Sequence, residues 1–429
     1  MGSGMNETIF ALSSGAPPAA IAVFRISGPG AKNSLFSLVG KDLAPRRATL
    51  ASLKASGGGL LDQALVVWFP GPNTATGEDL VELHCHGGRA VIAAVEAELE
   101  KHEGCRKAEP GEFTRRAFVN GRIDLSQAEG LAELLRAETE IQRVSAVAMS
   151  GGTLSREVEG WREILLVVSA EIEAVLDFGD EEDVPESDID LSDQLSELLL
   201  TLESWLSRPR SERIGEGLRI LFLGPPNTGK SSLFNAIIES EAAITSPSAG
   251  TTRDTLERSV AIDGIPFTFI DTAGLHEAAV DTIELEGIER ARREIEKADL
   301  VLWLGPEYEG PSGCWEIESQ VDIKTDLVKN ETAWRVSAAT GDGLFALKAA
   351  LVGWARDVLP KPGEAVLTAR QHARLKEVYA ALSEVPTKKD PLIVAECLRR
   401  ARASMDQLLG KTTTEDMLDA LFGQFCIGK

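Results

Sequence analysis

Residues 224–231 constrain this chain more than any other stretch, and they read Gly-Pro-Pro-Asn-Thr-Gly-Lys-Ser. An apolar run, 218–223, precedes the octapeptide, and Leu233, Ala236 and Ile237 follow it at helical spacing. A strand, a glycine-bounded loop and a helix in this order form the context that a phosphate-binding loop requires. The glycines let backbone N–H groups curl around phosphate oxygens, and the helix N-terminus adds a partial positive charge. The stretch therefore predicts an α/β domain that binds a nucleotide, with a chance Gly-Lys-Ser turn as the alternative.

Two side chains of this loop have roles that their chemistry suggests. The Lys230 ammonium reaches the β and γ phosphates, and the Ser231 hydroxyl is a ligand for Mg²⁺. We expect the nucleotide to contact Asn227, Thr228, Gly229, Lys230, Ser231 and Ser232.

Two later segments suit the γ-phosphate. Gly250-Thr251-Thr252-Arg253-Asp254 stands where GTPases carry a threonine that completes the Mg²⁺ shell, so we assign that role to Thr252 and a nucleotide contact to Thr251. A strand predicted at 265–270 ends in Asp271-Thr272-Ala273-Gly274. This segment supplies a carboxylate near Mg²⁺ and a backbone N–H, from Gly274, to the γ-phosphate.

Two more segments suit a guanine base. After a strand predicted at 300–304, Lys324-Thr325-Asp326 fits a pattern in which Asp326 accepts both N–H donors of guanine. The pair Ser337-Ala338 would approach the base oxygen. GTP is therefore the predicted nucleotide.

Two positions depart from the usual GTPase pattern. Leu275 stands where many GTPases have a glutamine that positions water, so another residue must do so. Ile323 stands where asparagine is usual, and the segment between Leu304 and Asp322 is too short for an ordinary helix plus strand. We therefore expect reduced affinity or selectivity for guanine, and a base end of the site that is either remodelled or poorly ordered.

The charge of the chain limits its partners. The net charge is −23, from 44 Lys plus Arg and 67 Asp plus Glu, which argues against a chain-wide basic surface for nucleic acid. Five scattered cysteines fit reduced thiols, and no run of 18 apolar residues occurs. We expect a soluble, cytoplasmic protein without membrane contact.

The regions around the nucleotide domain differ in character. Before about residue 120, strands predicted at 21–26, 64–69 and 80–84 and a helix at 90–101 indicate an α+β unit. His84 and His86 share a strand face, but two ligands do not make a metal site. Leucines at helical spacing over 125–206, and again beyond Pro360, predict an all-α region on both sides of the nucleotide domain. Insertion of that domain into the helical one is favoured over three domains in a row, because no long flexible linker separates the parts.

Further segments give the chain a resemblance to a known family, and they are Phe24-Arg25-Ile26-Ser27-Gly28-Pro29, Thr76-Gly77-Glu78-Asp79, Pro110-Gly111-Glu112-Phe113-Thr114 with Arg116-Ala117-Phe118, Gly287-Ile288-Glu289-Arg290, and Cys426-Ile427-Gly428-Lys429. With the nucleotide motifs, they resemble the tRNA modification GTPase MnmE family, also called TrmE, over essentially the whole chain. The carboxyl-terminal Cys-Ile-Gly-Lys is the most specific piece. The resemblance implies an α+β N-terminal dimerisation and tetrahydrofolate-binding domain over 5–120. It also implies a helical domain in two parts, 121–216 and 356–429, around an inserted P-loop GTPase domain at 217–355.

The resemblance also implies how hydrolysis is achieved. The chain would form a homodimer whose GTPase domains meet when GTP and K⁺ are bound. By position, the K⁺ ligands would be Asn227, Ser246, Ser248 and Thr251. The catalytic glutamate would be Glu284, with Glu286 as a minor candidate. It would position the water, which a glutamine does in many GTPases and Leu275 cannot do.

The implied reaction adds an aminomethyl or carboxymethylaminomethyl group at C5 of the wobble uridine of tRNA, together with the FAD-dependent partner MnmG in a heterotetramer or larger complex. A 5-formyl- or 5,10-methylene-tetrahydrofolate would lie near Arg25, Glu82, Arg122 and Lys429. Cys426 would be either a nucleophile on a one-carbon adduct or a buried thiol. A ribosome-assembly GTPase and a nucleotide-gated scaffold with weak hydrolysis are the alternatives.

Overall fold

The computed structural model describes residues 7–178, 192–239, 242–243, 256–271, 292–323, 329, 333–361, 364–387, 390–412 and 414–429. Contacts divide the chain into two compact units, one joining 1–132 with 406–429 and the other comprising 133–405. The division falls within two helices, α4 (Leu125–Arg136) and α13 (Pro391–Leu409). The domain boundaries predicted at 120, 216 and 355 stay predictions.

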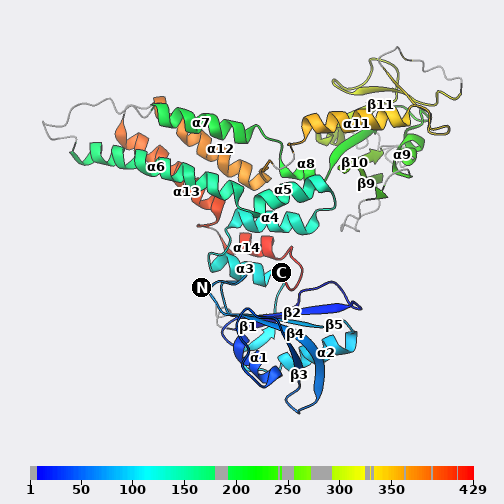
Figure 1. The fold of residues 1–429 in the computed structure, drawn as a ribbon. Coiled ribbons are helices and arrows are strands. Elements are labelled where there is room, and N and C mark those ends of the chain that lie inside the picture. The colour runs from blue at the N-terminus through cyan, green and yellow to red at the C-terminus, as the bar shows by residue number, and fades with distance from the viewer. Residues whose placement is uncertain are drawn as a thin grey trace, which may run out of the picture. The chain divides into compact units, whose positions relative to one another are not determined.

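Six strands form the sheet of the first unit, in the order β3-β4-β5-β2-β1-β6 (Figure 1). Neighbouring strands are antiparallel, except β1 and β6, which run parallel. The strands are β1 Thr8–Leu12, β2 Ile21–Ser27, β3 Thr49–Lys54, β4 Leu60–Phe69, β5 Leu80–His86 and β6 Cys105–Lys107. The three predicted strands are confirmed as β2, β4 and β5.

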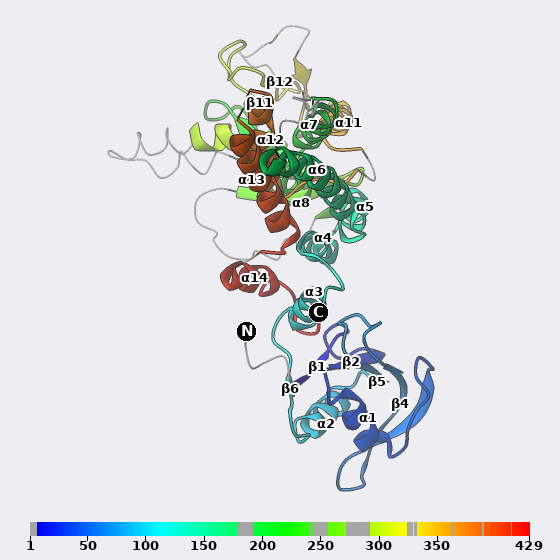
Figure 2. The same cartoon turned by 90° about the vertical axis from the view of Figure 1, so that its left-hand side faces the viewer.

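One face of this sheet is covered by two helices, α1 (Ala31–Val39) and α2 (Arg89–Leu99) (Figures 1 and 2). Successive strand residues point to opposite faces, so Phe24 and Leu83 are buried against the helices while their neighbours face away. Burying such large apolar side chains contributes about 1.5–3 kcal/mol each. The predicted helix at 90–101 is confirmed as α2.

The last residues of the chain complete the first unit. Helix α14 (Glu415–Phe422) packs with α3 (Glu112–Val119) and the start of α4 around Leu125 and Phe422, which are almost wholly buried. The helical pattern predicted beyond Pro360 is therefore confirmed in this segment. A carboxyl-terminal helix thus belongs to the core of an amino-terminal unit.

The second unit contains a seven-stranded sheet in the order β13-β12-β11-β7-β10-β9-β8. The strands from β13 to β10 run parallel, and β9 is antiparallel to both of its neighbours. The strands are β7 Leu218–Leu223, β8 Ala242–Ala243, β9 Leu256–Ile262, β10 Ile265–Asp271, β11 Leu300–Trp303, β12 Trp315–Glu318 and β13 Trp334–Arg335. The predicted strands at 218–223, 265–270 and 300–304 are confirmed, and the apolar run of β10 is buried throughout, as expected for a strand inside a parallel sheet.

Helices surround this sheet and extend away from it (Figure 1). Helix α9 (Lys230–Glu239) follows the phosphate loop, and α11 (Leu344–Val358) packs its buried face into the same core. Other described helices of the unit are α5 Glu140–Ser150, α6 Thr153–Phe178, α7 Ser192–Leu206, α8 Ser211–Gly215 and α12 Ala369–Glu384. The helical regions predicted on both sides of the nucleotide segment are thus confirmed.

The connection from β11 to β12 departs from ordinary parallel-sheet architecture. Residues 304–314 link these two parallel strands through turns and bends without a helix, whereas such crossovers usually contain one. The indole N–H of Trp303 donates to the carbonyl of Pro306 at 2.7 Å, which holds the first turn. The segment before Asp322 therefore has a strand but no helix, as its length predicts, and a remodelled base end of the site stays a prediction.

Candidate nucleotide site

The phosphate loop joins the end of β7 to the start of α9, where the carboxyl ends of parallel strands meet. Gly224 (φ 152°), Asn227 (φ 62°) and Gly229 (φ 84°) have positive φ angles, so the loop curls in the way that the glycine spacing predicted. A Cβ on Gly224 would lie 3.0 Å from the backbone nitrogen of Gly305, just past β11. Glycine is therefore required by backbone conformation and by close packing.

Lys230 is buried and folds back over the loop. Its ammonium group donates to the carbonyls of Gly224 at 2.9 Å and Pro225 at 2.6 Å. Burial lowers the pKa of Lys230, and the negative charge of Asp271 acts in the opposite direction. The loop therefore holds a desolvated cation, which is the electrostatic setting in which an anion is bound most strongly.

Asp271 lies at the carboxyl end of β10, beside the strand that leads into the phosphate loop. The register pairs Asp271 with Phe222 of β7, two residues before Gly224, and Asp271 is fully buried. The sequence placed this carboxylate near a magnesium ion, and a buried oxygen ligand whose charge acts on Lys230 fits that role. Ser231 opens α9 and Ser232, the next residue, is exposed.

The base side of the site is held by a buried serine. The Ser337 hydroxyl donates to Asp322 Oδ1 at 2.6 Å and accepts from the backbone N–H of Thr340 at 3.1 Å. Because the Ser337 side chain is used inside the protein, contact with guanine would fall to the backbone of the half-buried Ala338. Ile323 is 57% exposed.

Several predicted site residues lie outside the described residues, and they are Ser246, Ser248, Thr251, Thr252, Thr272, Ala273, Gly274, Glu284, Lys324 and Asp326. Their assignments stay predictions.

Ser319 donates to the Thr228 carbonyl, and Gln320 lies against Gly229. These contacts with the phosphate loop were not predicted, because neither residue belongs to a nucleotide-binding pattern. Their only signal in the sequence is a position just before the guanine-recognition segment.

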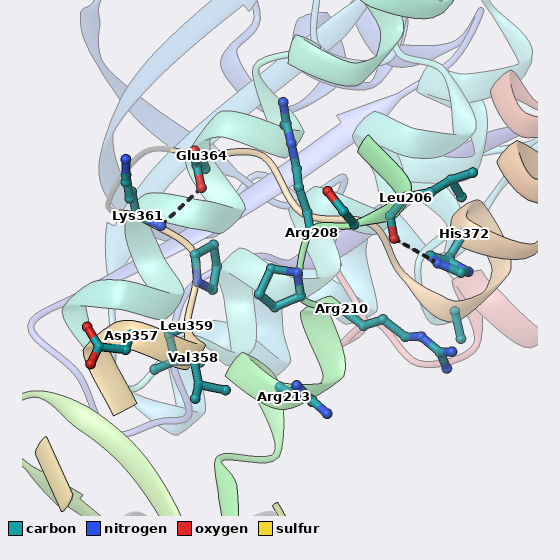
Figure 3. A pocket seen from close by; sticks show the side chains of 14 residues that line it. Leu206, Arg208, Arg210, Arg213, Asp357, Val358, Leu359, Lys361, Glu364 and His372 are labelled. Carbon is teal, nitrogen blue, oxygen red and sulfur yellow. Dashed lines mark hydrogen bonds between the residues drawn. The ribbon is translucent and has the colours of Figure 1, made fainter. Parts of the chain in front are cut away.

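A separate cavity of about 910 Å³ lies where the chain enters and leaves the GTPase region, between 206–213 and 357–372 (Figure 3). Its walls carry more basic than acidic groups, including Arg208, Arg210 and Lys361. None of the predicted site residues that the structure describes lines it.

In the first unit, two of the four predicted folate residues are in contact. Arg25 Nε donates to Glu82 Oε1 at 3.0 Å across the β2–β5 pair, and His84 Nε2 lies 3.4 Å from Glu82 Oε2. His86 contacts Asp62. Among the described residues there is no group of three or more His, Cys, Asp or Glu side chains that could hold a metal ion.

The carboxyl-terminal tail docks at the end of β1 in the same sheet. A Cβ on Gly428 (φ 95°) would lie 2.4 Å from the carbonyl oxygen of Leu12, and Ile427 bridges to Pro110. The tail therefore brings Lys429 to the end of β1, the strand that pairs with the Arg25 strand. Cys426 is exposed in this chain, and its role stays a prediction.

Arg122, the fourth predicted folate residue, is exposed. A Cβ on Gly77 would lie 3.3 Å from Arg122 Cγ, so Arg122 lies against the loop that precedes β5.

Among the helices that the structure describes, none combines the length and the apolar character of a membrane span.

Comparisons with known proteins agree with this architecture. A family model described as the GTP-binding protein TrmE N-terminus matches residues 8–122, and one described as the MnmE helical domain matches 125–426. A tRNA modification GTPase MnmE from Erythrobacter litoralis is 58% identical over 423 residues, covering 99% of this chain and 100% of the relative. One from Novosphingobium aromaticivorans is 56% identical over 440 residues, covering 99% and 100%.

Among solved structures, the G domain of the T. maritima FeoB iron transporter aligns with 32% of this chain and 98% of its own, at 22% identity and a TM-score of 0.24. The family of this chain is shown by the family models and the full-length relatives. The chain belongs to the family of the tRNA modification GTPase MnmE.

Proposed function

We propose that the chain binds and hydrolyses GTP and thereby serves the modification of tRNA at C5 of the wobble uridine. The observation that carries the nucleotide part is the curled loop around Lys230 with buried Asp271 at the end of the neighbouring strand. The RNA part rests on the relatives, which are named tRNA modification GTPases. The group added would be aminomethyl or carboxymethylaminomethyl, and the partner would be the FAD-dependent MnmG with its own RNA-binding surface, which suits a chain of net charge −23.

Magnesium would be held by Ser231 and Thr252, with Asp271 close by. When bound, it would supply positive charge to the β and γ phosphates. The described residues suit this ion, because Asp271 is a buried carboxylate beside a loop that holds only one cation, Lys230. Lys230 itself would exchange its bonds to loop carbonyls for bonds to charged phosphate oxygens.

Hydrolysis would depend on a homodimer of GTPase domains and on K⁺. The side chain of Asn227 and groups of Ser246, Ser248 and Thr251 would hold K⁺. Asn227 is exposed, at the tip of the loop, where a second monovalent charge could approach the phosphates. Glu284 would orient the attacking water, a task that Leu275 cannot perform because its side chain forms no hydrogen bonds.

A tetrahydrofolate derivative, 5-formyl or 5,10-methylene, would bind the first unit near Arg25, Glu82, Arg122 and Lys429. The support is that Arg25 and Glu82 form a half-exposed ion pair and that the docked tail brings Lys429 to the adjoining strand. The acidic side chain suits the N–H edge of a pterin, and the basic ones suit the carboxylates of a glutamate tail. Exposed Cys426 remains available as a nucleophile toward a one-carbon adduct.

The test compares GTP turnover by the full-length chain in KCl and in NaCl at equal ionic strength. We expect faster turnover in KCl, and we expect Glu284→Ala to bind GTP normally but hydrolyse it on the order of 100-fold more slowly. Glu286→Ala is the matched control and should retain turnover. Equal slow rates in both salts would count against K⁺, and equal loss of binding and hydrolysis in Glu284→Ala would make Glu284 structural.

The RNA assignment has its own readout. Purified tRNA carrying an unmodified wobble uridine is incubated with the chain, the FAD-dependent partner, GTP and the folate, and its nucleosides are analysed by mass spectrometry. A mass gain at that uridine is expected only when GTP is present. Turnover of GTP without any gain would leave a ribosome-assembly GTPase as the better interpretation.

A further inference from the structure

A short segment after β12, residues 319–323, touches both sides of the nucleotide site. At its start, the hydroxyl of Ser319 donates to the backbone carbonyl of Thr228 in the phosphate loop. These residues are 91 positions apart in the chain. The bond therefore connects the phosphate loop to residues 319–323, although no sequence motif links the two segments.

The next residue strengthens this connection. Gln320 has a φ of 58°, and a Cβ placed on Gly229 would lie 3.3 Å from Cγ and Nε2 of Gln320. The side chain of Gln320 therefore packs on the last glycine of the phosphate loop. A positive φ at a residue other than glycine costs free energy, so the surrounding contacts must hold it.

The end of the segment is fixed on the base side. Asp322 accepts the 2.6 Å hydrogen bond from Ser337, whose side chain is fully buried, and the N–H of Val321 donates to the carbonyl of Val336 at 3.4 Å. Ser319 and Asp322, three residues apart, thus connect the phosphate loop to the loop that carries Ala338.

Ile323 takes no part in these polar contacts, because its side chain has neither a hydrogen-bond donor nor an acceptor. It stands where GTPases usually have an asparagine, whose amide can both donate and accept. The two contacts that join the loops are made by its neighbours, Ser319 as donor and Asp322 as acceptor.

We propose that Ser319 and Asp322 are positioning residues, which hold the phosphate loop and the base-side loop at a fixed separation in a chain that lacks an asparagine at 323. The inference rests on the proposed binding of GTP. A nucleotide touches both loops at once, so a site with its loops already fixed loses less freedom on binding and releases its ligand more slowly. The role is one of placement, since neither side chain needs to touch the nucleotide.

The test measures how fast a fluorescent GDP analogue dissociates from the full-length chain. In Ser319→Ala, loss of one neutral hydrogen bond should speed dissociation by about three- to tenfold, and Ser319→Thr, which keeps the hydroxyl, should restore the slow rate. The unfolding temperature without nucleotide is measured in parallel and should fall no further in Ser319→Ala than in the control variant described next, which loses a comparable bond.

The matched control is Ser383→Ala, which removes another bond from a serine hydroxyl to a backbone carbonyl, that of Tyr379 at 2.7 Å in α12. It should leave the dissociation rate unchanged. The inference fails if Ser319→Ala releases GDP at the wild-type rate, or if Ser383→Ala accelerates release equally. A wild-type chain that binds no GDP would instead refute the proposed function on which the inference rests.

Discussion

Lys230 shows how burial prepares a single side chain for its ligand. Its ammonium group is desolvated and donates to loop carbonyls, and burial lowers its pKa. Neutral carbonyls are weaker partners for an ammonium than phosphate oxygens, because charge-assisted hydrogen bonds are roughly twice as strong. A bound phosphate would therefore displace these contacts and move the pKa of Lys230 back upward.

The five cysteines should differ widely in reactivity, which gives a prediction at this scale. Burial, together with the charge of Asp62, raises the pKa of Cys85 to about 12, and burial raises that of Cys105 to about 11. At pH 8 only roughly one Cys85 thiol in ten thousand is then ionised, and the thiolate is the reactive form. Cys426 is exposed.

We expect iodoacetamide at pH 8 to modify Cys426 first and Cys85 last, as measured by mass spectrometry of tryptic peptides over time. Raising the pH toward 11 should accelerate Cys105 before Cys85, provided that the chain stays folded. The unfolded chain in urea is the control and should lose the difference. Modification of Cys85 as fast as Cys426 in the folded chain would contradict the burial that the structure shows.

At the scale of elements, a buried ion network joins α3 to the loop before β5. Arg116 donates to Glu78 Oε2 at 3.0 Å and to Glu112 Oε1 at 3.1 Å, and Ser27 donates to Glu78 at 2.8 Å. Burial acts to raise the pKa of Glu112, but hydrogen bonds, chiefly from Arg106, outweigh it, and the pKa lies below its ordinary value. Stability from Glu112 is therefore present above its ordinary pKa and is lost as the pH falls through the lowered one.

Replacing Arg116 should therefore be costly, and its neighbour provides a matched control. Arg116→Leu leaves Glu78 without its buried cation, although Glu112 keeps its bonds to Arg106, and should lower the free energy of unfolding by about 3–5 kcal/mol. Arg115→Leu removes ion pairs with the largely exposed Glu415 and Asp419 and should cost less than about 1 kcal/mol. Urea unfolding measures both, and equal losses would show that burial does not decide the cost.

The elements themselves were largely predictable, whereas their contacts were not. Alternating or continuous apolar runs predicted β2, β5, β7 and β10, because burial imposes the period of the strand on the sequence. The bond between Ser319 and Thr228 and the docking of Gly428 on Leu12 join residues far apart in the chain. No local pattern encodes such pairs, since a serine hydroxyl or a glycine has the same appearance in any loop.

The nucleotide site shows the same limit. The phosphate loop and Asp271 were predictable because phosphate chemistry restricts the residues that can serve there. Ser337 was assigned to the base, but its hydroxyl is bonded to Asp322 inside the protein. The sequence pattern therefore predicts which residue lies near the site, but not which group its side chain hydrogen-bonds.

At the scale of the whole molecule, the GTPase region is connected to the helices of its unit by two segments that lie side by side. Arg210 bridges to Leu367, and the N–H of Ser211 donates to the carbonyl of Leu367 at 3.0 Å. Arg208 stacks on Trp205, with 3.8 Å between its guanidinium carbon and the ring centroid, and donates to the carbonyl of Ala365 at 3.1 Å. The segments that enter and leave the GTPase region, around Arg210 and Leu367, are thus hydrogen-bonded to each other.

This pairing predicts that the GTPase region can be removed without loss of the helical fold. We expect a chain with residues 212–366 replaced by a short Gly-Ser linker to keep the packing of α7 on α12 and to unfold cooperatively, because the cut ends already lie together. Circular dichroism and the fluorescence of Trp161 and Trp205, which pack edge to face at 6.0 Å, measure this. The shortened chain should bind no GTP, and gradual, non-cooperative melting would contradict the prediction.

The docked carboxyl terminus has a consequence for the order of events during translation. Phe422 and Phe425 share a core with Leu125, and Gly428 closes against β1, so the unit that contains β1 also needs residues 415–429, which the ribosome adds much later. Amino-terminal domains generally fold while synthesis continues. Here part of the unit's apolar surface stays uncovered until those residues have been synthesised.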